Sequence, residues 1–278
     1  MMESKLYIIP TPIGNLKDIT LRALEVLKES DVIYCEDSRN TIKLLNHYNI
    51  KGNLISYHEH NENSRIDEIL ENLRENKVLS LVSDAGMPGI SDPGHVIIKK
   101  LIEEKMPFEV LPGPSATITA LVLSGLDNEK FSFLGFFPRK NKDRNEFLED
   151  LKNRPETVII YESVHRIVDT LKNLSSNFPN RQVAVIREMT KIYEEVIRGS
   201  LQEVYDIYRE KENVKGEFVI VLDSYEVEEK LDIKKLLEIE LEKGLTKKSA
   251  ISEVSKKYGL RKNEVYQISL EIGDGLEE

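Results

Sequence analysis

The chain has 278 residues, of which 40% are hydrophobic and 32% are charged, and this composition is typical of a globular protein with one large or two ordinary domains. The formal charge of −10 at pH 7 argues against a surface that binds nucleic acid over its whole area, although it leaves room for a local basic patch. Neither a signal-peptide core nor an apolar run of about 20 residues occurs, so we expect a cytoplasmic protein. Cys35 is the only cysteine, which excludes an intrachain disulfide and a zinc site built from cysteines.

Apolar runs of strand length alternate with amphipathic stretches of helix length from the start of the chain to about Leu222. This alternation predicts a mostly parallel α/β architecture. The runs form two halves that meet near 112–125, so we expect an N-terminal α/β domain at 1–115 and a C-terminal α/β domain at 116–224. Helices are expected at 21–28, 65–75 and 166–174. Strands are expected at 6–9, 32–35, 54–57, 78–82, 108–111, 131–137, 157–161, 182–186, 195–198 and 218–222.

Beyond residue 224 the composition changes to Glu-rich and Lys-rich helix formers, which predicts a helical domain at 225–278. Thr246 can cap a helix that runs to Lys257, and Gly259 can form the turn to a second helix at 262–272. Two short helices around a glycine turn resemble a helix-turn-helix, and a solvated helical hairpin packed on its neighbour explains the pattern equally well. Between 245 and 263 a single acidic residue is accompanied by six basic residues: Lys247, Lys248, Lys256, Lys257, Arg261 and Lys262.

The loop at 83–94, Ser-Asp-Ala-Gly-Met-Pro-Gly-Ile-Ser-Asp-Pro-Gly, follows a predicted buried strand. Its three glycines let the backbone approach a ligand closely, and its two prolines fix the path of the chain. Open α/β sheets bind their ligands just beyond the carboxyl ends of the strands, so this loop predicts a binding site. Stiff turns at 10–15 and 111–116 end two further strands, and Ser115 with Ala116 can open the next helix with free N–H groups.

Acidic side chains recur directly after predicted strands. One such residue is weak support for a site, but their recurrence predicts a shared cleft at this edge of the sheets. These residues are Glu36 and Asp37, Asp84, Glu162 and Glu188.

Some of these polar residues have a simpler explanation. Asp37 and Arg39 can form a charged pair that faces a ligand, and capping of the following helix by Asp37 or Ser38 is an equally good explanation. Asp92 precedes Pro93, and this dipeptide fits an N-cap followed by proline at the first helical position.

Common ligand motifs are absent from the sequence. No Gly-x-Gly-x-x-Gly and no Walker A pattern occurs, so ordinary dinucleotide and P-loop sites lose their main support. His58 and His60 form a close pair, but the other histidines are scattered along the chain. Without a third ligand such a pair is rarely a metal site, and we expect no metal.

Eight segments of the chain resemble, in order, the ribosomal RNA small-subunit methyltransferase I family, which is the RNA-modifying branch of the tetrapyrrole methylase superfamily. Relatives that modify tetrapyrroles have a glycine-richer first loop, of Gly-x-Gly-Pro-Gly-Asp type, whereas this chain has Pro-Thr-Pro-Ile-Gly-Asn at 10–15, which favours the RNA branch. Three positions depart from the usual pattern of the branch: Ser38, Met87 and Val164. The matching segments lie at 11–20, 36–39, 83–94, 112–116, 135–140, 161–166, 187–191 and 198–199.

The resemblance implies a two-domain class III methyltransferase fold with an appended helical domain. It implies S-adenosylmethionine as the methyl donor, bound in a cleft between the two α/β domains, and no metal. It further implies methyl transfer to the ribose 2′-oxygen of a cytidine in the decoding region of 16S ribosomal RNA, within the small ribosomal subunit, by a homodimer. The positions that correspond to donor contacts are Pro12, Gly14, Ala85, Gly86, Met87, Ile90, Ser115, Ala116, Glu162, Thr190 and Gly216.

Transfer to a ribose hydroxyl needs the acceptor oxygen in line with the sulfur–methyl bond, and a nearby base should speed the step by about 10²–10⁴-fold. From their positions at strand ends, we expect Asp37 or Asp84 to be this base. We expect Arg39 and Lys191 to hold the nucleotide phosphate or to orient the nucleobase. Basic side chains supply most of the sequence-independent affinity for RNA. We therefore expect phosphate contacts from Arg139, Lys140, Lys142, Lys247, Lys248, Lys256 and Lys257.

Two other functions are compatible with parts of this pattern. A methylase that acts on a tetrapyrrole-type small molecule would have an apolar pocket and would not need the basic clusters. A non-catalytic nucleic-acid-binding protein would depend on the helical tail alone, and this function would leave the loops at the strand ends unexplained.

Overall fold

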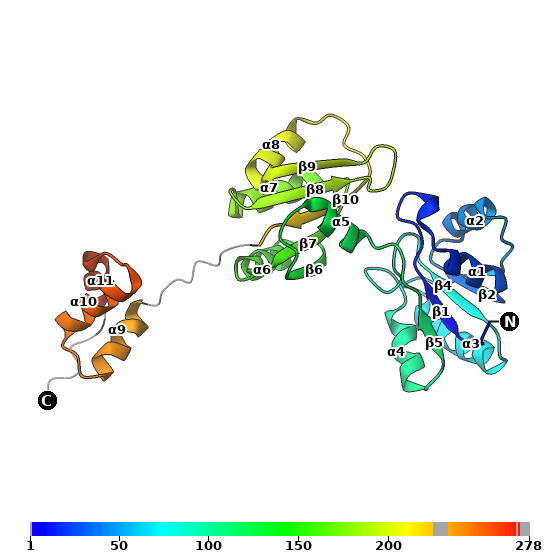
Figure 1. The fold of residues 1–278 in the computed structure, drawn as a ribbon, viewed down its shortest axis with the longest axis horizontal. Helices are drawn as coiled ribbons and strands as arrows, with labels where there is room; N and C mark the ends of the chain where they lie inside the picture. The colour runs from blue at the N-terminus through cyan, green and yellow to red at the C-terminus, as the bar shows by residue number, and fades with distance from the viewer. Residues whose placement is uncertain (1, 225–232, 271, 273–278) are drawn as a thin grey trace. The chain divides into compact units, whose positions relative to one another are not determined.

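The computed structural model describes residues 2–224, 233–270 and 272 of the chain, which is drawn in Figure 1. Contacts divide the chain into two compact units, Met1–Glu226 and Val227–Glu278. Within the described residues, the first unit contains two five-stranded sheets, one from each half of its sequence. The predicted domain boundaries at 115 and 224 stay a prediction.

The first sheet has the strand order β3-β2-β4-β1-β5, and all of its neighbouring strands are parallel. Because crossover helices cover both faces of such a sheet, its central strands are buried and, apart from Ser80 in β4, composed of residues that pack in the cores, which is why they could be located as short apolar runs. The strands are β1 (Leu6–Ile9), β2 (Val32–Cys35), β3 (Leu54–Ser56), β4 (Leu79–Val82) and β5 (Phe108–Val110). The helices between them are α1 (Leu21–Glu29), α2 (Ser38–His47), α3 (Glu62–Arg74) and α4 (His95–Glu103), and a 3₁₀ turn (Leu16–Asp18) precedes α1.

Alternate side chains of β1 enter two different cores. Tyr7 and Ile9 pack with residues of α1 and α2 on one face of the sheet, whereas Leu6 and Ile8 pack with residues of α3 and α4 on the other. This alternation follows from the two-residue period of a strand. The carboxyl ends of β1, β2 and β4 therefore lie at one edge of a rigid sheet, and the loops that follow them are held by two cores.

The second sheet has the order β6-β7-β10-β8-β9. Only β6 and β7 pair in parallel, while the β7–β10, β10–β8 and β8–β9 pairs are antiparallel, so the expected mostly parallel arrangement is wrong for this half. The turn between β8 and β9 spans 188–194, and a connection this short can join only antiparallel neighbours. The strands are β6 (Phe131–Phe136), β7 (Thr157–Ser163), β8 (Gln182–Arg187), β9 (Glu195–Ser200) and β10 (Glu217–Leu222).

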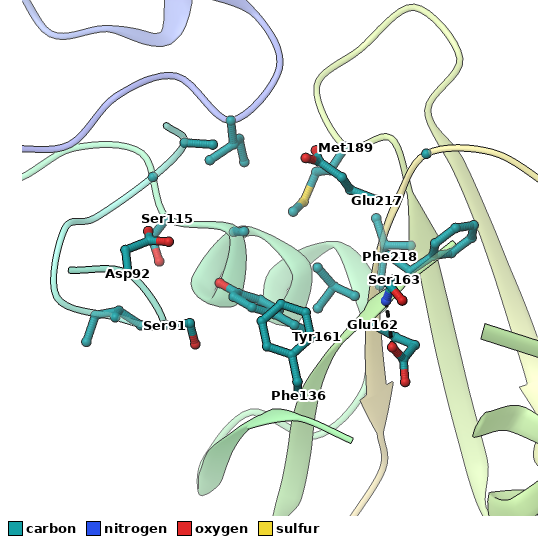
Figure 2. Close-up of a pocket in the computed structure, with 18 of the residues that line it drawn as sticks. Ser91, Asp92, Ser115, Phe136, Tyr161, Glu162, Ser163, Met189, Glu217 and Phe218 are labelled. Carbon is teal, nitrogen blue, oxygen red and sulfur yellow. Dashed lines mark hydrogen bonds between the residues drawn. The ribbon is translucent and has the colours of Figure 1, made fainter. Parts of the chain in front are cut away.

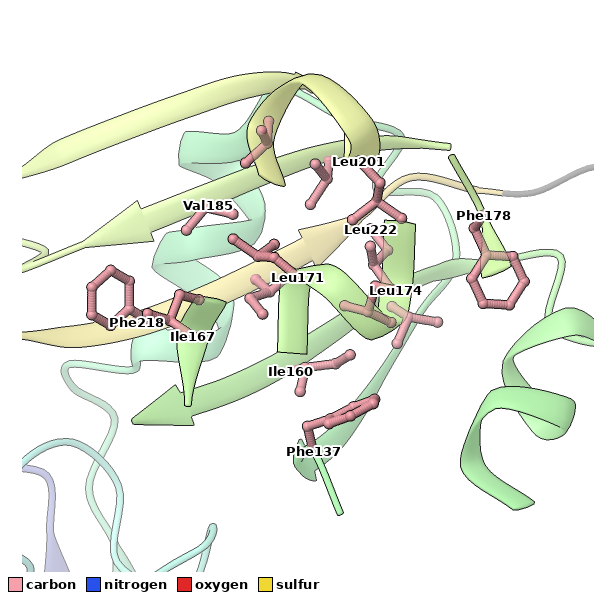
Figure 3. Packing of buried hydrophobic residues seen from close by; sticks show 14 of the residues in the cluster. Phe137, Ile160, Ile167, Leu171, Leu174, Phe178, Val185, Leu201, Phe218 and Leu222 are labelled. Atoms are coloured by element: carbon pink, nitrogen blue, oxygen red, sulfur yellow. The ribbon is translucent and has the colours of Figure 1, made fainter. Parts of the chain in front are cut away.

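One face of the second sheet carries the larger core, shown in Figure 3, in which Leu171 and Leu174 pack against Ile160, Val185 and strand residues around them. Helix α5 covers the opposite face with Ala120 and Leu121. Burial on both faces again explains the apolar runs of β7, β8 and β10. The helices of this half are α5 (Ala116–Ser124), α6 (Asn141–Lys152), α7 (Ile167–Asn177) and α8 (Leu201–Glu210).

The second unit contains α9 (Ile233–Glu242), α10 (Lys247–Tyr258) and α11 (Lys262–Ser269), which surround their own small core. The Thr246 side chain accepts the backbone N–H of Ser249 at the start of α10, as the sequence predicts. Gly259 ends this helix in the left-handed conformation, with φ of 67°, which confirms the predicted turn. Helix α11 ends at Ser269, earlier than the expected 272.

Candidate functional site

A cavity of about 580 Å³ opens at the loops that follow the strands of both sheets (Figure 2). Its size is in the range of ligand pockets, which is roughly 300–1,000 Å³. Asp92 and Ser91 line one wall, Glu217 and Phe218 line another, and the side chain of Tyr161 lies among them. The cavity therefore collects residues from segments that are up to about 200 positions apart in the sequence, which the tertiary fold alone brings together.

The loop at 83–94 is held against the first strand by a two-residue bridge. The backbone N–H of Thr11 donates to the carbonyl of Gly86 and the N–H of Gly86 donates to the carbonyl of Thr11, both at 2.9 Å. The buried hydroxyl of Thr11 also donates to the carbonyl of Ser83 at 3.0 Å. These bonds fix the backbone of Ala85 and Gly86, both of which line the cavity. The loop predicted to bind a ligand therefore has a rigid floor.

Asp92 does not cap α4, and this part of the interpretation is wrong. The N-cap of the helix is Gly94, whose φ of 140° few other residues adopt, and no side chain caps the helix. A Cβ on Gly94 would lie 3.2 Å from the nitrogen of Gly89, so the close packing of these two glycines delays the start of the helix. Asp92 is thereby released from a capping role and lines the cavity instead.

Two carboxyl groups in the cavity have pKa values above the ordinary range. Burial raises the pKa of Asp92 to about 7, the negative charge of Glu36 adds to this rise, and a hydrogen bond with Ser83 opposes it. Burial also raises the pKa of Glu36, and the nearby charge of Asp84 contributes in the same direction. These shifts have the same origin, because several acids at strand ends meet in one partly buried place.

An aromatic wall borders the cavity on the side of the second sheet. Tyr161 and Phe136 are in edge-to-face contact with ring centroids 5.8 Å apart, and Phe133 packs on the same tyrosine at 4.6 Å. The hydroxyl groups of Tyr161 and Thr117 form a hydrogen bond of 2.8 Å, which orients the tyrosine ring. Phe136 lines the cavity with 52% of its surface exposed, so it presents an apolar face at the cavity mouth.

Glu162 lies in the cavity lining, but both oxygens of its carboxylate are bonded to other groups of the protein. The side chain has no exposed surface, and one oxygen pairs with the guanidinium of Arg166 at 2.6 Å and accepts the backbone N–H of Ser163 at 2.6 Å. The other oxygen accepts the hydroxyl of Thr170 at 2.6 Å. Arg166 donates in turn to the carbonyl of Phe137. This network joins β7 to α7 and holds the loop between them.

A contact between the two halves of the first unit borders the site. The hydroxyl oxygen of Thr190 accepts the backbone N–H of Asn15 at 3.0 Å, although Thr190 has a φ of 65° that is unfavourable for a β-branched residue. A Cβ on Gly14 would lie 2.6 Å from atoms of Met189, Thr190 and Lys191, so only glycine allows this approach. The first loop and the β8–β9 turn are therefore locked together.

Most of the residues predicted to contact the donor lie in the cavity lining. The exceptions are Pro12, Gly14 and Thr190, which are neighbours of lining residues Ile13 and Met189. The members found in the lining are Ala85, Gly86, Met87, Ile90, Ser115, Ala116, Glu162 and Gly216.

The residues predicted to be catalytic lie outside the cavity lining. Asp37 accepts the backbone N–H of Arg39 as the cap of α2 and forms a 2.6 Å ion pair with the same arginine, whose hydrogen bonds lower the pKa of Asp37 to about 2. Asp84 accepts the N–H of Asp37 at 3.1 Å and the side-chain amide of Asn40 at 3.0 Å. Lys191 forms ion pairs with Glu188 and Glu217. Their catalytic role stays a prediction.

The residues predicted to bind RNA fall into two groups. Arg139, Lys140 and Lys142 are exposed at the start of α6, three to six positions after Phe136. In the second unit, Lys248, Lys256 and Lys257 are exposed on α10, and the ammonium of Lys257 lies 5.4 Å from the centroid of the Tyr258 ring. Lys247 lies on the same helix and donates to the carbonyl of Ile272 at 3.2 Å.

Several lining residues were not assigned to the site from the sequence. Glu36 was noted only as an acid at a strand end, and its cavity position follows from that pattern. Phe136, Tyr161 and Met189 lie in segments that carry the family resemblance, but the sequence does not single them out as site residues. Phe218 gives no local signal of a site. Among the described residues, no group of three or more His, Cys, Asp or Glu side chains is placed to hold a metal ion, and no helix is both long and apolar enough to cross a membrane.

The family model of tetrapyrrole (corrin/porphyrin) methylases matches residues 5–205. The ribosomal RNA small subunit methyltransferase I of Halalkalibacterium halodurans is 43% identical over 274 residues, which cover 96% of this chain and 94% of that protein. The protein of the same name from Hydrogenobaculum sp. is 49% identical over 219 residues, which cover 78% of this chain and 95% of that protein.

Solved structures of class III methyltransferases have the same fold as the first unit. A diphthine synthase aligns with a TM-score of 0.61 at 16% identity, covering 79% of this chain and 90% of that one. A uroporphyrin-III C-methyltransferase from Thermus thermophilus, complexed with S-adenosylhomocysteine, aligns with a TM-score of 0.54 at 21% identity, covering 78% and 96%. The predicted fold class is thus confirmed, and the chain belongs to the tetrapyrrole methylase family and, within it, to the group of proteins named ribosomal RNA small subunit methyltransferase I.

Proposed function

We propose that this protein is an S-adenosylmethionine-dependent methyltransferase that acts on ribosomal RNA of the small subunit. The proposed acceptor is the ribose 2′-oxygen of a cytidine in the decoding region of 16S ribosomal RNA. Enzymes of this family use S-adenosylmethionine as the methyl donor, and relatives at 43–49% identity carry the name of a small-subunit RNA methyltransferase.

The observation that carries this proposal is the charge of the cavity. Among its described lining residues there are four acidic side chains, Glu36, Asp92, Glu162 and Glu217, but no Lys or Arg. Glu162 and Glu217 are paired with Arg166 and Lys191 from outside the lining, so Glu36 and Asp92 are the acids without a cationic partner in the part of the chain that the structure describes. Such a lining suits a ligand with a positive centre, as the sulfonium of the donor is, and disfavours a phosphate ligand. Apolar side chains, such as those of Met87, Ile90 and Phe218, offer the remaining contact surface.

The proposed donor site uses the small residues of the lining. Ala85, Gly86, Ser115, Ala116 and Gly216 bring backbone groups to the cavity surface, where peptide N–H and C=O groups can bind the polar parts of the donor. Ser115 is the N-cap of α5 and makes no capping hydrogen bond with its side chain, so the first N–H groups of this helix are available at the cavity. When bound there, the donor supplies an electrophilic methyl group.

Support for an RNA substrate comes from the surroundings of the cavity mouth. Phe136 is half exposed in the lining, and Arg139, Lys140 and Lys142 follow it on the surface. Exposed aromatic rings stack on unpaired bases, and neighbouring basic residues bind the phosphates of the same strand. We propose that the target nucleotide enters the site over Phe136.

Methyl transfer to isolated subunits tests the proposed function. Small ribosomal subunits from cells that lack this gene should accept labelled methyl groups from S-adenosylmethionine in the presence of the protein, and the label should map to one cytidine 2′-oxygen in the decoding region. A porphyrinoid acceptor serves as the parallel reaction. If the porphyrinoid becomes labelled and the subunits do not, the protein is a tetrapyrrole methylase instead. If the protein binds the donor but labels neither acceptor, the proposed function is wrong.

Replacing the four predicted RNA-contacting lysines of α10 by glutamine should weaken the salt dependence of RNA binding. Each lost phosphate contact lowers the slope of log K against log salt by about 0.7–0.9. Filter binding from low to high salt measures this slope, and an unchanged slope would exclude these lysines from RNA contact. The variant replaces Lys247, Lys248, Lys256 and Lys257, and a control with the same charge change replaces exposed lysines of the first unit, Lys28, Lys51, Lys99 and Lys172.

We also propose that the protein forms a homodimer and works in the cytoplasm, where its proposed substrate is. Helix α5 has apolar side chains on both its buried and its exposed side: Ala120 and Leu121 pack on the second sheet, while Ile118 and Val122 are 48% and 69% exposed. A second copy of the chain would cover this exposed apolar face. The mass of the protein in solution, measured by light scattering, tests this.

A further inference from the structure

We propose that Asp92 is the base that takes the proton of the acceptor hydroxyl in this cavity. The inference rests on the proposed methyltransferase function and names a residue that the sequence pattern had assigned to helix capping. It follows from the position of Asp92 in the lining and from the bonding of the other cavity carboxylates, which we consider one by one.

The other carboxylates of the lining are less available for proton transfer. Glu162 uses both oxygens in short bonds to Arg166, Thr170 and the backbone. Glu217 is paired with Lys191 at 2.8 Å, and 75% of its side chain is exposed. Glu36 has one oxygen 3.4 Å from the backbone nitrogen of Asp84. A base should have an oxygen free to reach the acceptor. Glu162 has no such oxygen, Glu217 is held in an ion pair, and Glu36 has one oxygen near a backbone N–H group.

Asp92 has no cationic partner within the described part of the chain. The charged groups that act on Asp92 are Glu36, which follows β2, and Asp84, which follows β4. The phenol of Tyr161, on β7, is the third titratable neighbour. Burial raises the pKa of Tyr161, and the charge of Asp92 raises it further. Ser83 acts in the opposite direction and lowers the pKa of Asp92. The partly buried carboxyl group therefore lies among acids and beside an aromatic ring in the cavity lining.

These surroundings suit a base that works near neutral pH. Asp92 has a pKa of about 7, which is close to the value at which a group is both largely deprotonated and still strongly basic at physiological pH. By comparison, the ion pair with Arg39 lowers the pKa of Asp37 to about 2, which makes it a weak proton acceptor.

The proposed step conserves atoms and charge. Asp92 accepts the hydroxyl proton as the hydroxyl oxygen forms a bond to the methyl carbon. The sulfur–methyl bond breaks at the same time, and its electron pair stays on sulfur, so the sulfonium becomes the neutral thioether S-adenosylhomocysteine. The products are the methyl ether, the thioether and the protonated carboxyl group of Asp92. Because Asp92 lines the same cavity as the proposed donor contacts, it needs no relay to reach the acceptor.

The experiment compares Asp92→Asn with the unaltered full-length protein on small ribosomal subunits that lack the modification. We expect the turnover rate at saturating donor to fall by about 10²–10⁴-fold. Donor affinity measured by calorimetry should change less than about threefold, because Glu36 keeps a negative charge in the lining. The rate of the unaltered protein should rise with pH through a midpoint near 7, and the residual rate of Asp92→Asn should lack this midpoint. Asp67→Asn, on the exposed face of α3, is the matched control and should retain full activity.

A second variant separates Asp92 from its acidic neighbour. Glu36→Gln removes a negative charge that raises the proton affinity of Asp92, so the midpoint of the pH profile should move to lower pH while a pH-dependent rate remains. Loss of the profile in Glu36→Gln and its retention in Asp92→Asn would overturn the assignment in favour of Glu36. Weaker donor binding by Asp92→Asn with an unchanged saturated rate would also overturn it, by making Asp92 a contact of the sulfonium. An unaltered protein that binds donor but methylates no subunit RNA would instead overturn the proposed function, and this inference with it.

Discussion

Replacing Arg166 by methionine is expected to lower the free energy of unfolding by about 3–5 kcal/mol. The carboxylate of Glu162 has no exposed surface, and Arg166 is the cation that compensates its charge, at 2.6 Å. Without the guanidinium, the bonds from Thr170 and Ser163 remain, but they cannot replace a full positive charge. Urea denaturation at pH 7 measures the effect, with the midpoint shifting and the slope unchanged.

The double replacement Glu162→Gln with Arg166→Met is the control for this expectation. Because it removes both charges and retains similar volumes, most of the lost stability should return, as expected when a buried ion pair is replaced as a whole. If the double variant were as unstable as Arg166→Met, the loss would come from packing of the arginine stem and not from the unpaired carboxylate. If Arg166→Met unfolds at the same urea concentration as the unaltered protein, the ion pair contributes little to the free energy of unfolding.

The same pair bears on the predicted donor contact of Glu162. Its oxygens accept bonds from Arg166, Thr170 and the backbone of Ser163, which leaves little capacity for a bond to a ligand. We therefore expect Glu162 to shape the cavity wall between β7 and α7. The sequence cannot distinguish the two roles, because both place an acid directly after a buried strand.

The strands could be predicted from the sequence because both sheets are covered on both faces. In β1 and β8, nearly every side chain enters a core, so each strand appears as an apolar run that Gly, Pro or charged residues end. Strand direction could not be predicted, because parallel and antiparallel strands buried on both faces have the same composition. The position of β10 between β7 and β8 is set by long-range pairing that no local pattern contains.

The site could be predicted in part for a related reason. The loop at 83–94 and the turn at 10–15 follow strands of one parallel sheet, and such loops converge at its carboxyl edge. Phe136, Tyr161 and Phe218 belong to the second sheet, and only the packing of the two halves brings them to the cavity. Asp92 was misinterpreted because Asp-Pro is a common start of a helix, whereas the packing of Gly94 on Gly89 moves that start to His95.

Asp92→Asn is also expected to stabilise the protein, by on the order of 1–3 kcal/mol above pH 7, once solvent screening of this partly exposed group is included. The pKa of Asp92 in the folded protein, about 7, lies above its ordinary value of 3.8. Between these values the folded state holds a proton that the unfolded chain has released, so the stability contributed by this group is complete below about pH 4 and is lost as pH rises to about 7.

Asparagine does not ionise, so Asp92→Asn should not lose stability in this way. The difference in free energy of unfolding between the variant and the unaltered protein should grow between pH 4 and pH 7 and then stay constant. Urea denaturation of both proteins at pH 5 and pH 8 measures the difference, and the same measurement on Asp67→Asn, at an exposed site on α3, serves as the matched control. An advantage of equal size at both pH values would mean that the carboxyl group of Asp92 titrates normally. If Asp92→Asn is more stable and less active than the unaltered protein, the carboxyl group of Asp92 serves the reaction and lowers the stability of the fold. If Asp92 had only a structural role, its replacement would make the protein less stable.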